Sequence, residues 1–199
     1  MLGWLAVGVT LAVALGLTLL RSRSDTPPSM PAMGMLGFAA AFAGPGLVAA
    51  AGLWRRRPDL VVAAAIVLVC LAPLSMGGAT LPLLIPAVVL LYVALRIPGP
   101  GLHAGLRVAT TLVTFGLLAA APIALFTTTE IVCWEDYGGG RIVSRVVPEM
   151  LNEQSSVAPF GSGCSSGSIS TLGGSLAVLA VAGAVAVAAS SGPKPDRRP

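Results

Sequence analysis

Three cysteines offer the chemistry that is easiest to interpret in this chain. Cys133 and Cys164 both lie in residues 127–171, the only long polar stretch, whereas Cys70 lies inside an apolar run. A disulfide between Cys133 and Cys164 would restrict the unfolded chain, an effect worth about 3.5–4 kcal/mol for a loop of this size. We predict this structural disulfide. A redox-active pair is the alternative, but no Cys-x-x-Cys spacing is present, and Cys70 is interpreted as a small packing residue.

One serine-containing motif matches the pattern of a hydrolase nucleophile. Residues 163–167 read Gly-Cys-Ser-Ser-Gly. The motif Gly-x-Ser-x-Gly needs a preceding strand, a following helix and a histidine that takes the serine proton. The only histidine, His103, lies in a connector that is predicted on the other side of the membrane. We therefore interpret Gly161 to Gly167 as a flexible linker, and keep an enzyme with Ser165 or a loop carboxylate as catalyst as a third hypothesis.

No other pattern in the chain indicates catalysis or cofactor binding. There is no Gly-x-x-x-x-Gly-Lys-Ser/Thr loop for a nucleotide, and the one lysine, Lys194, lies in the C-terminal tail. No further cysteine or histidine lies on the predicted side of Cys133 and Cys164, as a zinc site would require. We predict no catalytic, cofactor-binding or metal-binding residues, no cofactor, and no enzymatic activity.

The apolar runs carry no charge. All 12 basic and 8 acidic residues lie outside them, Arg107 standing at the beginning of the fifth run. Ionisable residues inside spans mark proton relays and ion pathways, so their absence argues against a proton-coupled pump or an intramembrane metalloprotease. Pro45, Pro73, Pro82 and Pro86 interrupt the runs, and such breaks expose backbone carbonyls that a transporter can use.

The composition of the chain indicates an integral membrane protein. The chain is 55% hydrophobic and 10% charged, against about 25% charged in soluble domains. We predict an all-α integral membrane protein, a bundle of about six transmembrane helices with one long extracytoplasmic loop. A span needs about 20 apolar residues. The predicted segments are helices at about 2–20, 33–54, 60–77, 79–95 and 107–126, the extracytoplasmic loop 127–171, a sixth helix at 172–191 and a basic cytoplasmic tail at 192–199.

Two of these assignments have alternatives. Residues 1–20 are also compatible with a cleaved signal peptide, although a basic beginning and a clear cleavage site are missing. Residues 60–95 are divided by the Ser75–Gly78 cluster into two spans, and a re-entrant hairpin is the alternative.

Basic residues predict the orientation. With six spans, eight basic residues share one side with both termini, and the opposite short loops carry only Arg21 and Arg23. The positive-inside rule then places the termini in the cytoplasm and residues 127–171 outside it. Cysteines in that loop agree, because disulfides persist in oxidising compartments. We expect a bacterial plasma membrane, from the bias towards Ala, Gly and Arg. The eight topology-setting residues are Arg55, Arg56, Arg57, Arg96, Arg107, Lys194, Arg197 and Arg198.

The polar stretch contains weaker local signals. Residues 141–147 are compatible with a strand or a helical turn, and Pro148 followed by Glu149 indicates a short helix to Gln154. Aromatic and acidic residues of the stretch either pack a small subdomain or form a partner surface, which would comprise Trp134, Glu135, Asp136, Tyr137 and Phe160. In the last helix, Ala180, Ala184 and Ala188 recur at every fourth position, which indicates close helix packing or chance in an Ala-rich segment.

Our main hypothesis is a multi-pass membrane protein of structural, accessory or regulatory type. It would contact a partner through the disulfide-closed loop, the partner being another membrane protein or a second copy, with the lipid bilayer around its helices. Nucleic acid is not expected as a partner, since no basic stripe with interleaved aromatics is present. The alternative is a small permease or channel for an uncharged or hydrophobic solute, with a polar cavity lined by Thr110, Thr111 and Thr114.

Overall fold

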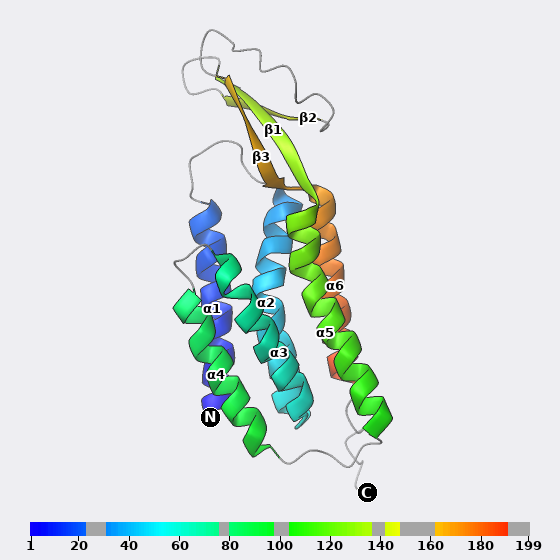
Figure 1. The fold of residues 1–199 in the computed structure, drawn as a ribbon. Helices are drawn as coiled ribbons and strands as arrows, with labels where there is room; N and C mark the ends of the chain where they lie inside the picture. Colours follow the sequence, from blue (N-terminus) through cyan, green and yellow to red (C-terminus); the bar gives the residue numbers. More distant parts are fainter. Residues whose placement is uncertain (23–30, 76–79, 98–103, 137–141, 148–161, 191–199) are drawn as a thin grey trace, which may run out of the picture.

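A bundle of helices with a small sheet beyond one end makes up the fold (Figure 1). It was obtained as a computed structural model, which describes residues 1–22, 31–75, 80–97, 104–136, 142–147 and 162–190. A helix lies over each of the predicted spans. The helices are α1 (Leu2–Ser22), α2 (Ala32–Trp54), α3 (Pro58–Leu71), α4 (Thr80–Arg96), α5 (Ala104–Thr127) and α6 (Thr171–Ser190), with a short 3₁₀ turn η1 (Pro73–Ser75) after α3.

Four of these helices, α1, α2, α5 and α6, are long and apolar enough to cross a membrane. The other two are shorter. With 14 residues in α3 and 17 in α4, they measure about 21 and 26 Å, less than the hydrocarbon core of about 30 Å. The third helix ends at Leu71 rather than continuing to residue 77, because Pro73 has no N–H to donate to the carbonyl of Val69.

The α3–α4 pair therefore forms a short hairpin, in which α3 packs against α2 and α5 and α4 packs against α1. Thr80 donates a hydrogen bond of 3.2 Å to the carbonyl of Ala72 and so links its two arms. In Figure 1 the hairpin ends short of the bundle end that carries the sheet. Whether residues 60–95 form two spans or a re-entrant hairpin stays a prediction.

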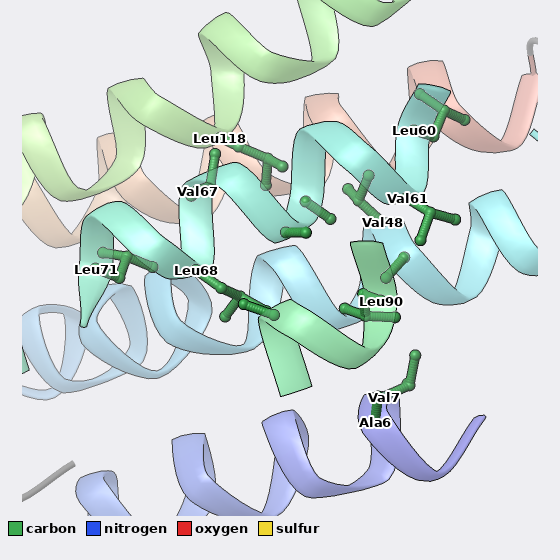
Figure 2. Close-up of a cluster of buried hydrophobic side chains, with 14 of the residues drawn as sticks. Ala6, Val7, Val48, Leu60, Val61, Val67, Leu68, Leu71, Leu90 and Leu118 are labelled. Carbon is green, nitrogen blue, oxygen red and sulfur yellow. The ribbon is translucent and has the colours of Figure 1, made fainter. Parts of the chain in front are cut away.

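The short hairpin nevertheless lies at the centre of the core. Figure 2 shows Leu60, Val61, Val67, Leu68 and Leu71 of α3 among side chains of the surrounding helices. Those side chains include Ala6 and Val7 of α1, Val48 of α2, Leu90 of α4 and Leu118 of α5.

The polar stretch folds as a three-stranded antiparallel sheet, which the all-α prediction missed. Its strands are β1 (Thr129–Asp136), β2 (Ile142–Val147) and β3 (Ser162–Ile169), in the order β2-β1-β3. The strand interpretation of residues 142–147 is confirmed, as expected for a segment rich in Val and Ile. The linker interpretation of Gly161 to Gly167 is wrong for residues 162–167, because the backbone of β1 pairs with this Gly/Ser-rich segment. The short helix predicted over 148–154 lies outside the described residues.

Small residues join α2 to α6. The buried face of α6 comprises Gly173, Gly174, Ala177, Val181, Ala184 and Ala188, whereas Ala180 is only partly buried. An α-helix has 3.6 residues per turn, so positions that recur at every fourth residue, such as Ala180, Ala184 and Ala188, do not stay on one face. The buried positions of α6 are therefore separated alternately by three and four residues. At its closest point a Cβ atom added to Gly37 of α2 would lie 2.6 Å from the carbonyl oxygen of Gly174.

Candidate functional site

The junction between sheet and bundle is the first candidate region, because it fixes how the sheet is held. Ser170 separates β3 from α6 and is 2% exposed. Its hydroxyl accepts a hydrogen bond of 2.8 Å from the N–H of Gly173, which caps α6, and donates one of 3.0 Å to the hydroxyl of Thr128. Thr128 in turn donates to the carbonyl of Ala124 in α5 at 2.6 Å. One residue, Thr128, therefore connects α5 to β1, and one residue, Ser170, connects β3 to α6.

The register of the sheet brings the two predicted disulfide partners together. Cys133 of β1 lies directly opposite Cys164 of β3. Opposite residues in an antiparallel pair have Cα atoms about 4.5–5.5 Å apart, and a disulfide spans about 4.4–6.8 Å. The backbone geometry is thus compatible with the Cys133–Cys164 disulfide, which stays a prediction. Cys70 lies apart from them in α3, as an exposed free thiol.

Three residues of the predicted partner surface lie at the end of β1 that is farther from the helices. Trp134 is paired with Ser144 and Gly163, Glu135 with Val143 and Ser162, and Asp136 with Ile142. The other two, Tyr137 and Phe160, lie outside the described residues. The central strand therefore places the Trp-Glu-Asp sequence between two outer strands, away from the bundle (Figure 1).

The serine motif does not form a nucleophile elbow. Ser165 lies within β3, opposite Val132 of β1, whereas an elbow requires a sharp turn from a strand into a helix. His103 lies outside the described residues. No cluster of three or more His, Cys, Asp or Glu residues that could hold a metal ion occurs in the part of the chain that the structure describes.

A charged cluster lies at the opposite end of the bundle, where α3 begins beside α5. Arg57 is 1% exposed and forms an ion pair with Asp59, to which it also donates a hydrogen bond of 3.3 Å from Nε. Arg57 Nη2 donates to Thr110 at 2.8 Å, and the Thr111 hydroxyl donates to Asp59 at 2.6 Å. Arg107 Nη2 lies 3.6 Å from the same carboxylate. The cluster thus joins the α2–α3 turn to α5.

The cluster changes the interpretation of several predicted residues. Arg57 and Arg107 were predicted only to set the topology, and Asp59 received no role, although an acid behind Pro58 is a helix-start signal. Thr110 and Thr111 bond within the cluster, and Thr114 donates to the carbonyl of Thr110 at 2.8 Å. None of these threonines lines the apolar cavity described below.

Asp59 is the cluster's titratable group, and it precedes the predicted span that begins at Leu60. Burial raises the pKa of its carboxyl, but the hydrogen bonds from Arg57 and Thr111 and the positive charge of Arg57 outweigh burial, so the pKa lies below its ordinary value. A carboxylate held in this way stays ionised near neutral pH and is suited to structure rather than proton transfer.

The other described arginines that were predicted to set the topology lie at the same end of the bundle as this cluster. Arg55 and Arg56 lie in the α2–α3 turn, and Arg96 at the end of α4 lies over the ring of Tyr92, 5.3 Å from its centre. These helix ends are the ones remote from the sheet, as are the N-terminus and the end of α6 (Figure 1). Lys194, Arg197 and Arg198 lie outside the described residues.

An apolar cavity of about 380 Å³ lies between α3 and α5, in the half of the bundle nearer the sheet. Its walls come from the last turns of α3, from η1 and from the second half of α5. The lining residues are Val67, Cys70, Leu71, Leu74, Phe115, Ala119, Pro122, Ile123, Phe126 and Thr127.

Comparison with models of known families, with curated proteins and with solved structures finds no match.

Proposed function

We propose that this chain is a multi-pass bacterial plasma-membrane protein of structural, accessory or regulatory type, which contacts a partner through its β2-β1-β3 sheet outside the cytoplasm. One observation carries the proposal: the only long polar stretch of the chain forms a sheet that lies beyond the ends of apolar helices (Figure 1). The helices supply the membrane anchor and the sheet supplies the polar surface.

The distribution of charge supports the proposed orientation. Arg55, Arg56, Arg57, Arg96 and Arg107 gather at the bundle end remote from the sheet, and the positive-inside rule assigns such an end to the cytoplasm. The sheet then lies in an oxidising compartment, in which the opposed Cys133 and Cys164 would form their disulfide.

The way the sheet is held supports a contact role. Ser170 and Thr128 tie the bases of β3 and β1 to α6 and α5, so the sheet has a fixed position relative to the membrane. Among the described strands β2 and β3 are the outer ones, and outer strands offer backbone groups to a partner. A partner bound there, either another membrane protein or a second copy of the chain, would be held close to the membrane surface.

Site-specific photo-crosslinking in intact cells tests this proposal. A benzophenone amino acid at Trp134 should give a crosslinked complex, whereas the same group at Leu179, an exposed position on α6, should give much less of it. Recovery of the chain only as an uncrosslinked monomer from the Trp134 position, with the protein correctly inserted, would overturn the proposed contact.

The alternative function, a small permease or channel for an uncharged or hydrophobic solute, is favoured by one observation. The cavity between α3 and α5 has the size of a small-ligand site and an almost wholly apolar lining. Flux of a panel of apolar solutes into liposomes tests this alternative, which requires a rate above that of protein-free liposomes.

A further inference from the structure

We propose that the groove between the end of α3 and the second half of α5 binds one acyl chain of a phospholipid from the membrane half nearer the sheet. The inference rests on the proposed function in one respect only, namely that the helices lie in a bilayer.

The groove lies where α5 extends past the end of α3. Thr111 of α5 donates to Asp59 at the start of α3, and Arg57 donates to Thr110. From this contact α3 continues for 12 residues to Leu71 and α5 for 16 residues to Thr127, which is about 18 and 24 Å. Since the chain turns at Pro73 into the hairpin, the last turn of α5 has no α3 beside it.

The walls of the groove match a hydrocarbon chain. Val67 and Leu71 form its buried floor, at 3% and 1% exposure, whereas Ile123 and Phe126 form an open rim, at 59% and 42% exposure. The hydroxyl of Thr127 is already bonded to the carbonyl of Ile123 at 2.7 Å. An apolar site of this kind does not hold water, which needs two or more polar partners, and in a bilayer the molecules that reach the open rim are lipid tails.

The position of the groove determines which half of the membrane supplies the lipid. Its lining residues on α5 begin at Phe115, beyond the charged cluster, and end at Thr127, two residues before β1. Contact between α3 and α5 at Asp59 and Thr111 closes the groove towards the cytoplasmic end. A bound acyl chain therefore belongs to a lipid of the membrane half nearer the sheet. Because the groove is closed at its other end, it is not a path through the membrane.

Photoactivatable phosphatidylcholine with a diazirine in its acyl chain, in vesicles holding the full-length protein, tests the proposal by peptide mapping. Adducts should concentrate on residues 67–74 and 115–127. Ala119→Trp, which fills the groove, should reduce these adducts about fivefold or more. Leu112→Trp is the matched control, since Leu112 lies on α5, is 63% exposed and does not line the groove. Cys70→Phe fills the groove from the α3 wall and should reduce the same adducts. It replaces Ala119→Trp as the test if that variant folds poorly.

The outcomes separate this proposal from the proposed membrane location. Adducts spread evenly over all exposed helix faces, unchanged by Ala119→Trp and Cys70→Phe, would overturn the groove site and leave the membrane location intact. Adducts on no helix face would overturn both. Adducts with a free apolar solute probe but not with the lipid would also overturn the acyl-chain site, and would favour the permease alternative.

Discussion

Replacing Gly174 by alanine tests whether α2 and α6 pack as closely as the structure shows. A Cβ atom at Gly174 would lie 2.7 Å from the backbone nitrogen of Gly34, and one at Gly37 would lie 2.6 Å from the carbonyl oxygen of Gly174. Both obstacles are backbone atoms, so no side-chain rotation relieves them. The two helices would have to separate by at least about 0.8 Å to restore an ordinary contact of about 3.5 Å with the Gly34 nitrogen. They would have to separate further to clear the carbonyl oxygen of Met33, which lies closer still to the added Cβ atom.

The energetic consequence follows from the loss of contact along the whole interface. A gap of 0.5–1 Å forfeits about a quarter to a half of the dispersion attraction between the atoms that it separates. Because Ala41 of α2 and Ala177 of α6 are almost fully buried in the same apolar cluster, they have no longer side chains to fill the gap. We expect Gly174→Ala to lower the free energy of unfolding by about 1–3 kcal/mol, the usual cost of an overpacked site.

The assay is unfolding in detergent micelles, followed by circular dichroism against temperature or sodium dodecyl sulfate. Gly116→Ala on α5 is the matched control, because a Cβ atom at Gly116 meets nothing within 4 Å, and alanine is the better helix former by up to about 1 kcal/mol. The double variant Gly37→Ala with Gly174→Ala should lose less than the sum of the single losses, since one helix separation relieves both clashes. Equal unfolding midpoints for Gly174→Ala and Gly116→Ala would refute the close packing.

Three further predictions concern the cysteines, the charged cluster and the junction. In denaturing detergent without reductant the protein should bind one maleimide, at Cys70, and after reduction three; three without reductant would disprove the disulfide. Asp59→Asn should destabilise the fold by about 3–5 kcal/mol because it removes the carboxylate that balances the charge of the buried Arg57. The lowered pKa of Asp59 gives stability that is lost as the pH falls below about 4, so acid should destabilise the wild type more than this variant. Ser170→Ala should cost about 1 kcal/mol through the lost cap of α6, measured by the same unfolding assay, whereas the exposed Ser175→Ala should cost little.

The positions of the helices could be predicted from the sequence because they depend on one local property, the length of an apolar run. The end of α3 could not be placed as well, since it depends on Pro73 and on the hairpin that follows. The sheet was missed because its third strand, rich in Gly and Ser, has little strand propensity of its own and is stabilised by pairing with β1. Pairing of distant segments leaves no signal in a single sequence.

The same distinction applies to the candidate sites. Cys133 and Cys164 could be matched from the sequence because they share one polar stretch, and the register sets them opposite each other. The hydrogen bond from Thr111 to Asp59 and the ion pair of Asp59 with Arg107 join α3 to α5 across the fold. Charge counting treats the arginines of this cluster only as orientation signals. The apolar cavity depends on the difference in length between α3 and α5, which the predicted helix of residues 60–77 concealed.

In the proposed arrangement apolar helices cross the membrane with the sheet on the outer side. Thr171→Cys and Ser190→Cys, each with Cys70 replaced by alanine, place a thiol at the two exposed ends of α6, about 29 Å apart. In intact spheroplasts a membrane-impermeant maleimide should label the first thiol directly and the second only after permeabilisation. Direct labelling of both would contradict the membrane crossing, and direct labelling of the second alone would contradict the orientation.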